Sequence, residues 1–342
     1  MKTKLSRRHA RPRLAKTRRV SNIRRTAPSI DIIIVNWNSG SLLRDCLLSI
    51  AACSKKGFSL KRVVVVDNAS MDESLQGLEN IKIPLVVLHN PVNRGFGAAS
   101  NLGAAESKSN YLLFLNPDTR LYENSLSKCL EFLTDSKNTD IGVLGIQMLD
   151  EKGRIWRTCS CFPTAHTFLT AVFGLDRMFP ETFKNHLMVD WDHAASRKVD
   201  HVMGSFYMVR SVLFEGLGGF DERFFVYLED LDFSLRARQA GSDVYYYAGV
   251  SAYHRGGGVS EKVRATRLFY ALRSRILYSY KHFDWVGATV VCLSTLCVEP
   301  FTRIVLAVLK LSARTIVETI VAYVRLWGNT PSMMTSRLGE GE

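Results

Sequence analysis

The first 29 residues of the sequence lack acidic side chains. They contain eleven Lys and Arg and no Asp or Glu, whereas the whole chain of 342 residues has a formal net charge of +13. The remainder of the chain therefore carries only about +2 (13 − 11). With almost no apolar residues to bury, residues 1–28 are predicted to form a disordered basic tail. The tail also lacks the apolar stretch of a secretory signal, so we expect no such signal here.

Two interpretations of this tail are equally good. It could bind anionic lipid, or it could be a solvated arm without a partner. Binding to nucleic acid ranks below both, because no nucleic-acid recognition module follows the tail.

The sequence also lacks a cysteine pattern typical of a disulfide scaffold or a zinc site. Its seven cysteines are odd in number, and Cys159-Ser-Cys161 is a lone C-x-C. We expect most of them to be reduced and buried, as in a cytosolic protein. Long apolar runs are missing too. The uncharged run at 285–298 has fourteen residues before Glu299-Pro300 interrupts it, whereas a helix that spans a bilayer needs about twenty.

From residue 30 onward, short apolar runs alternate with helical patterns. The runs are rich in β-branched residues, too short for helices, and followed by polar residues or glycine. Continuous apolar strands that alternate with helices indicate an α/β fold with a mainly parallel sheet covered on both faces. Predicted strands cover 30–37, 62–70, 84–90, 111–119 and 141–149, and predicted helices cover 41–53, 98–107 and 125–136.

Polar side chains gather directly after these strands. The ligand of such a sheet lies beyond the carboxyl ends of the strands, so these side chains should share one rim. Asp67 suits a hydrogen bond to a ribose hydroxyl or a base, although helix capping explains it equally well. Asp118 suits Mg²⁺ or Mn²⁺, although a type I turn around Pro117 explains it equally well. The rim residues are Asn36, Trp37, Asn38, Asp67, Asn68, Asn93, Arg94, Asn116 and Asp118.

Two glycine-containing stretches adjoin this rim. The turn at 93–97 has an incomplete dinucleotide fingerprint after the third strand instead of the first, which argues against a dehydrogenase. It fits a turn that exposes backbone N–H groups near a phosphate, beside Arg94. His254 precedes three glycines and is a candidate metal-binding partner of Asp118, although a lone histidine is more often structural.

The stretch 219–241 mixes acids with aromatic rings. Acids in the first turn of a helix that starts at Glu229 would be stabilised by about 0.3–1 kcal/mol each, which explains the acids but not the rings. The rings indicate a cleft wall that excludes water from Asp230 and raises its pKa toward that of a general base. The acids are Asp221, Glu222, Glu229, Asp230 and Asp232, and the rings include Phe220, Phe224, Phe225, Tyr227 and Phe233.

Beyond residue 255 the pattern becomes helical and basic. A helix is predicted at 264–282, and residues 313–327 form an amphipathic helical pattern. A small helical domain with an ordinary core fits this region. A helical appendage that lies in a bilayer surface fits better, because basic and aromatic residues flank the apolar runs.

Seven of these segments, in this order, resemble the family 2 inverting glycosyltransferases, specifically their bacterial rhamnosyltransferase-like branch. They are IIIVNWNS, VVVVDNASMDES, NRGFGAASNLGA, LFLNPDT, MGSFYMVR, GGFDERFFVYLEDLDFSLRARQAG and YHRGGGVS, within about residues 30–260. The resemblance implies a GT-A fold over 29–260, which binds a nucleotide-sugar with Mg²⁺ or Mn²⁺ on its diphosphate. Residues 261–342 would form a helical C-terminal region that contacts a membrane surface or the acceptor.

The resemblance also implies a role for individual residues of this sequence. Asp230 would be the catalytic base, and Asp118 and His254 would bind the metal. The family's D-x-D element reads Asn116-Pro117-Asp118 here, so its first carboxylate is missing, a form common in this branch. Donor-binding residues would be Asn36, Asn38, Asp67, Asn68, Arg94, Gly95 and Asn116, and the acceptor side would include Glu229, Tyr227 and Phe225.

The implied reaction moves a sugar, with inversion, to a hydroxyl of a lipid-linked or polysaccharide acceptor in cell-envelope glycan synthesis. The favoured donor is dTDP-L-rhamnose, with UDP-hexose or UDP-galactofuranose as alternatives. The acceptor would be polyprenyl-diphosphate-linked or a glycan, and the enzyme would lie at the cytoplasmic face of the inner (plasma) membrane without binding nucleic acid. A non-enzymatic membrane or nucleic-acid adaptor that uses the basic tail is the alternative of another class.

Overall fold

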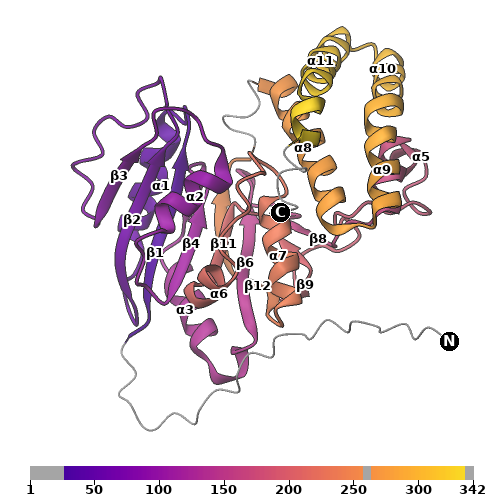
Figure 1. The fold of residues 1–342 in the computed structure, drawn as a ribbon. Coiled ribbons are helices and arrows are strands. Elements are labelled where there is room, and N and C mark those ends of the chain that lie inside the picture. The colour runs from indigo at the N-terminus through magenta and orange to yellow at the C-terminus, as the bar shows by residue number, and fades with distance from the viewer. Residues whose placement is uncertain (1–26, 257–262, 336–342) are drawn as a thin grey trace, which may run out of the picture.

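A computed structural model describes residues 27–256 and 263–335 (Figure 1). The predicted basic tail therefore lies almost entirely outside the described residues, as do Gly257 and Gly258 after His254. The chain forms a sheet covered by helices, followed by a group of C-terminal helices on one side (Figure 1).

One sheet of ten strands forms the centre of the fold, in the order β3-β2-β1-β4-β11-β6-β12-β5, with β7 beside β6 and β9 beside β12. Strands β3, β2, β1 and β4 are parallel, whereas β11 is antiparallel to both β4 and β6. Its strands are β1 (Ser29–Asn36), β2 (Ser59–Asp67), β3 (Leu85–His89), β4 (Tyr111–Leu115), β5 (Thr119–Leu121), β6 (Ile141–Leu149), β7 (Ile155–Trp156), β9 (Arg197–Val199), β11 (Phe206–Arg210) and β12 (Asp243–His254). A separate pair joins β8 (Cys159–Ser160) and β10 (His201–Val202).

Helices cover both faces of this sheet because alternate side chains of each strand point to opposite faces. Ile32 and Ile34 pack with the buried side of α1 and α3, whereas Ile33 packs on the side of α2, α6 and α7. The predicted mainly parallel α/β fold is confirmed. The helices are α1 (Ser41–Ala52), α2 (Phe96–Ala104), α3 (Ser125–Thr134), the 3₁₀ turn Ser136–Asn138, α4 (Ala165–Val172), α5 (Leu175–Met178), α6 (Ser211–Gly216) and α7 (Glu229–Gln239).

The C-terminal helices pack on α8 (Arg264–His282), which lies between the sheet and the others in Figure 1. They are α9 (Trp285–Leu293), a π-helical turn (Ser294–Val298), α10 (Glu299–Leu309) and α11 (Ala313–Thr335). Phe269 and Leu272 of α8 share a buried cluster with Tyr323 and Leu326 of α11.

The predicted interruption at Glu299-Pro300 is wrong. Residues Trp285–Leu309 form one continuous helix of 25 residues, and this is the one helix among the described residues that is long and apolar enough to cross a membrane. Pro300 is the second residue of α10 and directly follows the π-helical turn, so the hydrogen-bond pattern changes near the proline but the helix does not end there. One third (33%) of the most apolar window of this helix is buried within the protein.

Candidate active site

The loops after β1 and β2 are joined by hydrogen bonds around Asp67. Asn36 Nδ2 donates to Asp67 Oδ1 at 2.9 Å and to the hydroxyls of Ser70 and Ser74 at 3.1 and 2.9 Å. The Ser70 amide donates to Asp67 Oδ2 at 3.2 Å. Asn36 is fully buried, so it lies behind Asp67 and orients that carboxylate instead of lining a pocket as predicted.

The two other polar residues predicted on these loops differ in exposure. Asn68 is buried, and its Nδ2 donates to the Gly95 carbonyl at 2.9 Å, which joins the β2 loop to the glycine-containing turn. Asn38 is partly exposed and adopts a positive φ of 49°, which asparagine tolerates better than most residues. Asn38 Oδ1 accepts from the Met71 amide at 2.7 Å. Asn38 therefore retains exposed surface for a ligand, whereas Asn68 serves the packing of the loops.

The glycine-containing turn packs against the loop that precedes α7. The Phe96 amide donates to the Phe225 carbonyl at 2.6 Å, and the Gly95 amide donates to Asn93 Oδ1 at 2.9 Å. The prediction that these amides are free for a phosphate is therefore wrong, because both already have acceptors. Glycine is needed at position 95 for another reason. Its φ is 84°, and a Cβ atom there would overlap the backbone of Phe225.

Asp118 and His254 lie together where β5 pairs with β12. His254 is opposite Thr119 in this antiparallel pair, and its Nε2 lies 3.3 Å from Asp118 Oδ1. Two ligands at right angles on one Mg²⁺ ion stand about 3 Å apart, since each bond is about 2.1 Å long. The pair therefore fits two neighbouring ligands of one ion. No group of three or more His, Cys, Asp or Glu that could hold a metal occurs in the part of the chain that the structure describes.

Both carboxylate oxygens of Asp230 accept backbone N–H groups. The Gly204 amide donates to Oδ2 at 2.7 Å, and the Leu231 amide donates to Oδ1 at 2.8 Å. The Asp230 side chain still keeps 15% of its surface exposed. The carbonyl of Ser205, the residue after Gly204, accepts the Asn116 amide at 3.2 Å. The Gly204–Ser205 dipeptide therefore joins Asp230 to the Asn116-Pro117-Asp118 loop.

A polar chain lies behind Asp230. His201 Nε2 is 3.7 Å from Asp230 Oδ2, and its Nδ1 is 3.1 Å from Ser234 Oγ. The Tyr207 hydroxyl is 2.9 Å from the same Ser234 oxygen. Burial lowers the pKa of His201, and the charge of Asp230 opposes this shift only in part. Sequence reasoning missed His201 and Gly204, although MGSFYMVR contains the glycine and begins two residues after the histidine.

The residues just before α7 are held in a strained conformation by α8. Tyr227 and Leu228 have φ values of 69° and 68°, and left-handed non-glycine residues cost about 1–3 kcal/mol each and often mark functional sites. Arg267 Nε donates to the Tyr227 hydroxyl at 3.2 Å. The Phe225 ring stacks on Tyr270, with centroids 4.2 Å apart. Tyr227 and Phe225, predicted on the acceptor side, thus already contact α8.

The predicted wall of aromatic rings is only partly present. Phe220 and Phe224 are buried in two separate core clusters, so neither can contact a ligand. Phe233 is buried in the core with Phe220, at a centroid distance of 5.5 Å. These rings stabilise the fold around α7, and their exposure to a cleft was predicted wrongly because local sequence does not reveal which elements cover them.

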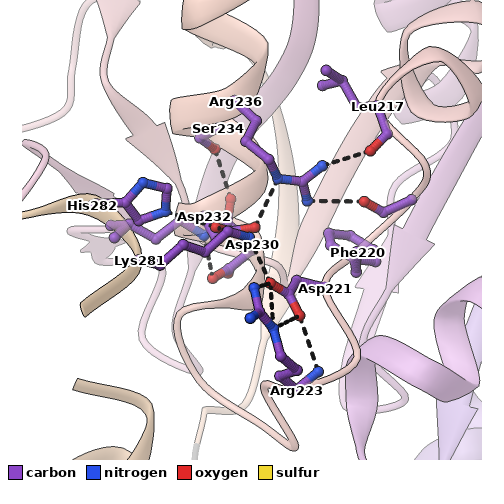
Figure 2. A network of polar contacts seen from close by, with 12 residues as sticks. Leu217, Phe220, Asp221, Arg223, Asp230, Asp232, Ser234, Arg236, Lys281 and His282 are labelled. Atoms are coloured by element: carbon purple, nitrogen blue, oxygen red, sulfur yellow. Dashed lines mark hydrogen bonds and ion pairs between the residues drawn. The ribbon is translucent and has the colours of Figure 1, made fainter. Parts of the chain in front are cut away.

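Two of the five acids are neutralised by bases from α8 (Figure 2). Asp232 is fully buried and accepts from Arg236 Nε at 2.8 Å, Lys281 Nζ at 2.7 Å and His282 Nε2 at 2.7 Å. Lys281 Nζ is also 2.5 Å from Asp221 Oδ2. Burial alone would raise the pKa of Asp232, but the hydrogen bond from His282 and the charges of Arg236 and Lys281 lower it below its usual value. These two acids therefore stabilise the packing of α7 on α8.

The remaining two acids also differ from Asp230. Glu222 is exposed, and its Oε2 lies 3.5 Å from Arg94 Nη2, where both side chains are about half-exposed. Glu229 is buried, and its Oε2 has no hydrogen-bond partner among the described residues. Burial, and secondarily the charge of Asp230, raise the pKa of Glu229 well above its usual value. Burial therefore favours the protonated form of Glu229 and encloses its side chain, contrary to its predicted place on the acceptor side.

Two hollows adjoin the Asp118 side of the site. The smaller one, of about 180 Å³, contains Asp118 and is lined by Leu42, Asp45, Asp118, Arg120, Glu151, Tyr253 and Arg255. The larger one, of about 600 Å³, shares Arg120, Glu151 and Tyr253 with it. Neither hollow includes Asp230, whose side chain is 15% exposed, or Asp67, which is buried.

Comparison with known proteins identifies the family. The sequence profile described as "Glycosyl transferase family 2" matches residues 31–203. The "Low-salt glycan biosynthesis hexosyltransferase Agl10" of Haloferax volcanii is 26% identical over 229 residues, which are 66% of this chain and 66% of that protein. The "Rhamnosyltransferase WbbL" of Escherichia coli is 28% identical over 170 residues, 47% of this chain and 60% of that protein. The chain thus spans slightly less than two thirds of the length of these two relatives.

A third relative and a solved structure are similar over more of their length. The "N-acetylglucosaminyl-diphospho-decaprenol L-rhamnosyltransferase" of Mycobacterium tuberculosis is 23% identical over 282 residues, 75% of this chain and 86% of that protein. The mannosyltransferase PcManGT of Pyrobaculum calidifontis, solved with GDP-Man and Mn²⁺, has a TM-score of 0.53 at 15% identity, covering 90% of this chain and 89% of that one. The predicted GT-A fold with C-terminal helices is confirmed.

Glu229→Gln tests the protonation of the buried acid. The folded protein keeps a proton on Glu229 that the unfolded chain releases above its ordinary pKa of about 4.5. Wild-type stability should therefore fall as the pH rises from that value toward the raised folded pKa, whereas the amide does not titrate. Urea unfolding measures the free energy of unfolding of both proteins at pH 5 and at pH 8. The value for the variant minus the value for wild type should be larger at pH 8 than at pH 5. The exposed Glu79→Gln serves as the control, and an equal difference at both pH values would contradict a neutral Glu229.

Proposed function

This chain belongs to glycosyl transferase family 2, and we propose that it transfers a sugar from a nucleotide-sugar to an acceptor hydroxyl by a single inverting displacement. The observation that carries the proposal is the placement of Asp230. Its carboxylate is fixed by two backbone amides, remains partly exposed, and is linked through one dipeptide to the loop that carries Asp118.

Asp230 is the proposed catalytic base. It accepts the proton of the acceptor hydroxyl while that oxygen attacks the anomeric carbon, and the bond to the nucleoside diphosphate breaks on the opposite face. The Gly204 and Leu231 amides fix the direction of the carboxylate, which reduces the cost of orienting it during the reaction. A single displacement inverts the anomeric centre and leaves no sugar on the protein.

The donor would lie across the rim between Asp67 and Asp118. Asp67, oriented by Asn36, is the proposed contact to base or ribose, with Asn38 beside it. Asp118 and His254 are the proposed ligands of Mg²⁺ or Mn²⁺, which would offset charge on the leaving diphosphate. Arg94, which is half-exposed, would contact the donor from the other side of the rim, together with the loop of Asn116.

We propose dTDP-L-rhamnose as the donor, because two of the relatives are named rhamnosyltransferases. A relative named hexosyltransferase keeps UDP-hexose and UDP-galactofuranose as alternatives. A polyprenyl-diphosphate-linked acceptor is proposed because one relative's name contains such a lipid. A thermal-shift panel of nucleotide-sugars, with and without divalent cation, tests the donor, since only a ligand that binds the folded state raises its stability.

The C-terminal helices are the proposed membrane contact, at the cytoplasmic face of the inner membrane. The helix Trp285–Leu309 has an exposed apolar stripe along its length, and α11 has a second one. Burial of exposed apolar side chains in lipid is favourable, by about 1.5–3 kcal/mol for a large side chain. The stripes consist of Val286, Val290, Leu293, Phe301, Val305 and Val308, and of Val317, Ile320, Val324 and Trp327.

Asp230→Asn should lower kcat by about 10²- to 10⁴-fold, because an amide cannot accept the proton. The affinity for the nucleotide-sugar should stay within about threefold, since the proposed donor contacts lie at Asp67 and Asp118 instead of Asp230. Steady-state kinetics and calorimetric titration measure the two quantities. The control is Asp200→Asn, an acid paired with Arg238, which should leave both unchanged. Turnover like that of wild type in Asp230→Asn would remove this residue as the base.

Asp118→Ala should abolish the dependence of nucleotide-sugar binding on Mn²⁺. Wild type should bind the donor more weakly in EDTA, whereas the variant should bind it equally weakly with and without the ion, as read from thermal shifts. The matched control is Asp45→Ala, an exposed acid of α1 that lines the same hollow. Full activity of wild type in EDTA would show that the metal assignment is incorrect.

The double variant Phe301→Asp, Leu309→Asp should bind vesicles at least about 10-fold more weakly than wild type. The two side chains are 69% and 74% exposed, so the charges should disturb the membrane contact and not the fold. Flotation with phosphatidylcholine–phosphatidylglycerol vesicles measures binding. Val212→Asp, at an equally exposed position of α6, is the control. Unchanged flotation of the double variant would count against a membrane contact through these helices.

A further inference from the structure

The basic residues of α8 fall into two groups. Arg275 and Lys281 each have carboxylate partners, with Arg275 Nη1 2.5 Å from Glu299 and Lys281 Nζ within 2.7 Å of Asp221 and Asp232. Arg267 and Arg273 form no ion pair with any residue of 27–256 or 263–335. The second group therefore carries positive charge that the described part of the protein does not neutralise.

Each arginine of this second group uses one N–H on the loop before α7. Arg267 Nε donates to the Tyr227 hydroxyl at 3.2 Å, and Arg273 Nη1 donates to the Arg223 carbonyl at 2.8 Å. A guanidinium has five N–H donors, so the contacts within the described residues leave most of their donor capacity for a ligand. Burial lowers the pKa of Arg273, and only Tyr270 opposes this shift. A half-buried cation without a counter-ion is unfavourable unless a ligand supplies the negative charge.

Further positive charge lies next to this pair. Arg264 is exposed one turn before Arg267, and Arg325 of α11 donates from Nη1 to Thr266 Oγ1 at 2.7 Å. Both Arg273 and Arg325 act electrostatically on Tyr270, the residue between the two half-buried arginines. Arg273 and Arg325 thus lie near Tyr270, while Arg267 and Arg264 precede Tyr270 by one and two turns on α8. We call these four residues the arginine cluster (Arg264, Arg267, Arg273 and Arg325).

The arginine cluster lies between the proposed base and the apolar helices. Tyr227, which Arg267 contacts, is three residues before Asp230, a span of at most about 11 Å along the chain. On its other side α8 packs against α11, whose outer face carries the second apolar stripe. An anion bound here would therefore have the base on one side and the membrane-facing helices on the other.

We propose that Arg267 and Arg273, supported by Arg264 and Arg325, bind the diphosphate of a lipid-diphosphate acceptor. This inference rests on the proposed function, which requires an acceptor hydroxyl beside Asp230. Guanidinium groups bind phosphate oxygens through paired hydrogen bonds, so two arginines suit the several oxygens of a diphosphate. The donor's own diphosphate has a separate proposed place at Asp118 and His254, and the two half-buried arginines are less accessible to bulk headgroups than exposed ones.

The test measures binding of farnesyl diphosphate to the full chain in detergent by calorimetry, in EDTA so that metal-dependent binding of the diphosphate at Asp118 is suppressed. Wild type should bind it at least about 10-fold more tightly than farnesol or inorganic diphosphate. The double variant Arg267→Gln, Arg273→Gln should bind it about 10- to 100-fold more weakly, the range expected for lost hydrogen bonds to charged groups. Arg267→Gln alone should show part of the loss, and Arg267→Lys less than the glutamine variant.

Two controls distinguish the sources of negative charge. Lys310→Gln removes one exposed positive charge at the end of α10 and should leave farnesyl diphosphate binding unchanged. Binding to phosphatidylglycerol vesicles should fall no more in the single variant Arg267→Gln than in Lys310→Gln. If Arg267→Gln lowers vesicle binding more than Lys310→Gln does, the arginines bind membrane headgroups and the proposal is overturned. Inorganic diphosphate that binds as tightly as farnesyl diphosphate would overturn the lipid part of it.

The remaining outcomes separate this inference from the proposed function. Nucleotide-sugars should raise the thermal stability of wild type and of the double variant Arg267→Gln, Arg273→Gln by the same amount. Equal binding of farnesyl diphosphate to both proteins would overturn the proposal and leave the transferase assignment intact. If no nucleotide-sugar stabilises wild type but farnesyl diphosphate binding still depends on the two arginines, the proposed function fails and the anion site stands.

Discussion

The buried ion cluster around Asp232 is the interaction on which the candidate site depends. Asp232 is fully buried, and two of its three basic partners, Lys281 and His282, come from α8 about fifty residues later in the chain. Removal of one member of a buried ion pair typically costs about 3–5 kcal/mol, because the remaining charge is left unpaired. Since α7 carries both Asp232 and Asp230, the orientation of the proposed base depends on α8.

The acids of the segment between β11 and the end of α7 are close in sequence but differ in their surroundings. Asp232 is paired with bases, burial raises the pKa of Glu229, and Asp230 remains partly exposed with its oxygens on backbone amides. Only the last arrangement leaves an accessible, oriented carboxylate. This difference in environment, more than the number of acids, singles out Asp230.

Much of the sheet could be predicted from the sequence, because buried parallel strands are continuous apolar runs and polar residues mark their ends. The proximity of Asp118 and His254 also followed from the segments that resemble the family. Other features depend on partners distant in sequence and could not be predicted locally. Gly95 is needed because the Phe225 backbone approaches it, and the rings near α7 are covered by other elements. The helix that contains Pro300 continues through a π-helical turn, which the sequence does not signal.

The contacts of α8 also change where the catalytic unit ends. The predicted division placed residues 29–260 in one domain and 261–342 in another. One side of α8 forms ion pairs with α7, another contacts the strained loop at Tyr227, and a third packs against α11. An element with three such interfaces cannot separate from the sheet without leaving buried charges unpaired. These contacts favour a catalytic unit that includes α8, instead of one that ends at residue 260. Attachment of α9–α11 to a membrane would then fix the direction from which an acceptor reaches Asp230.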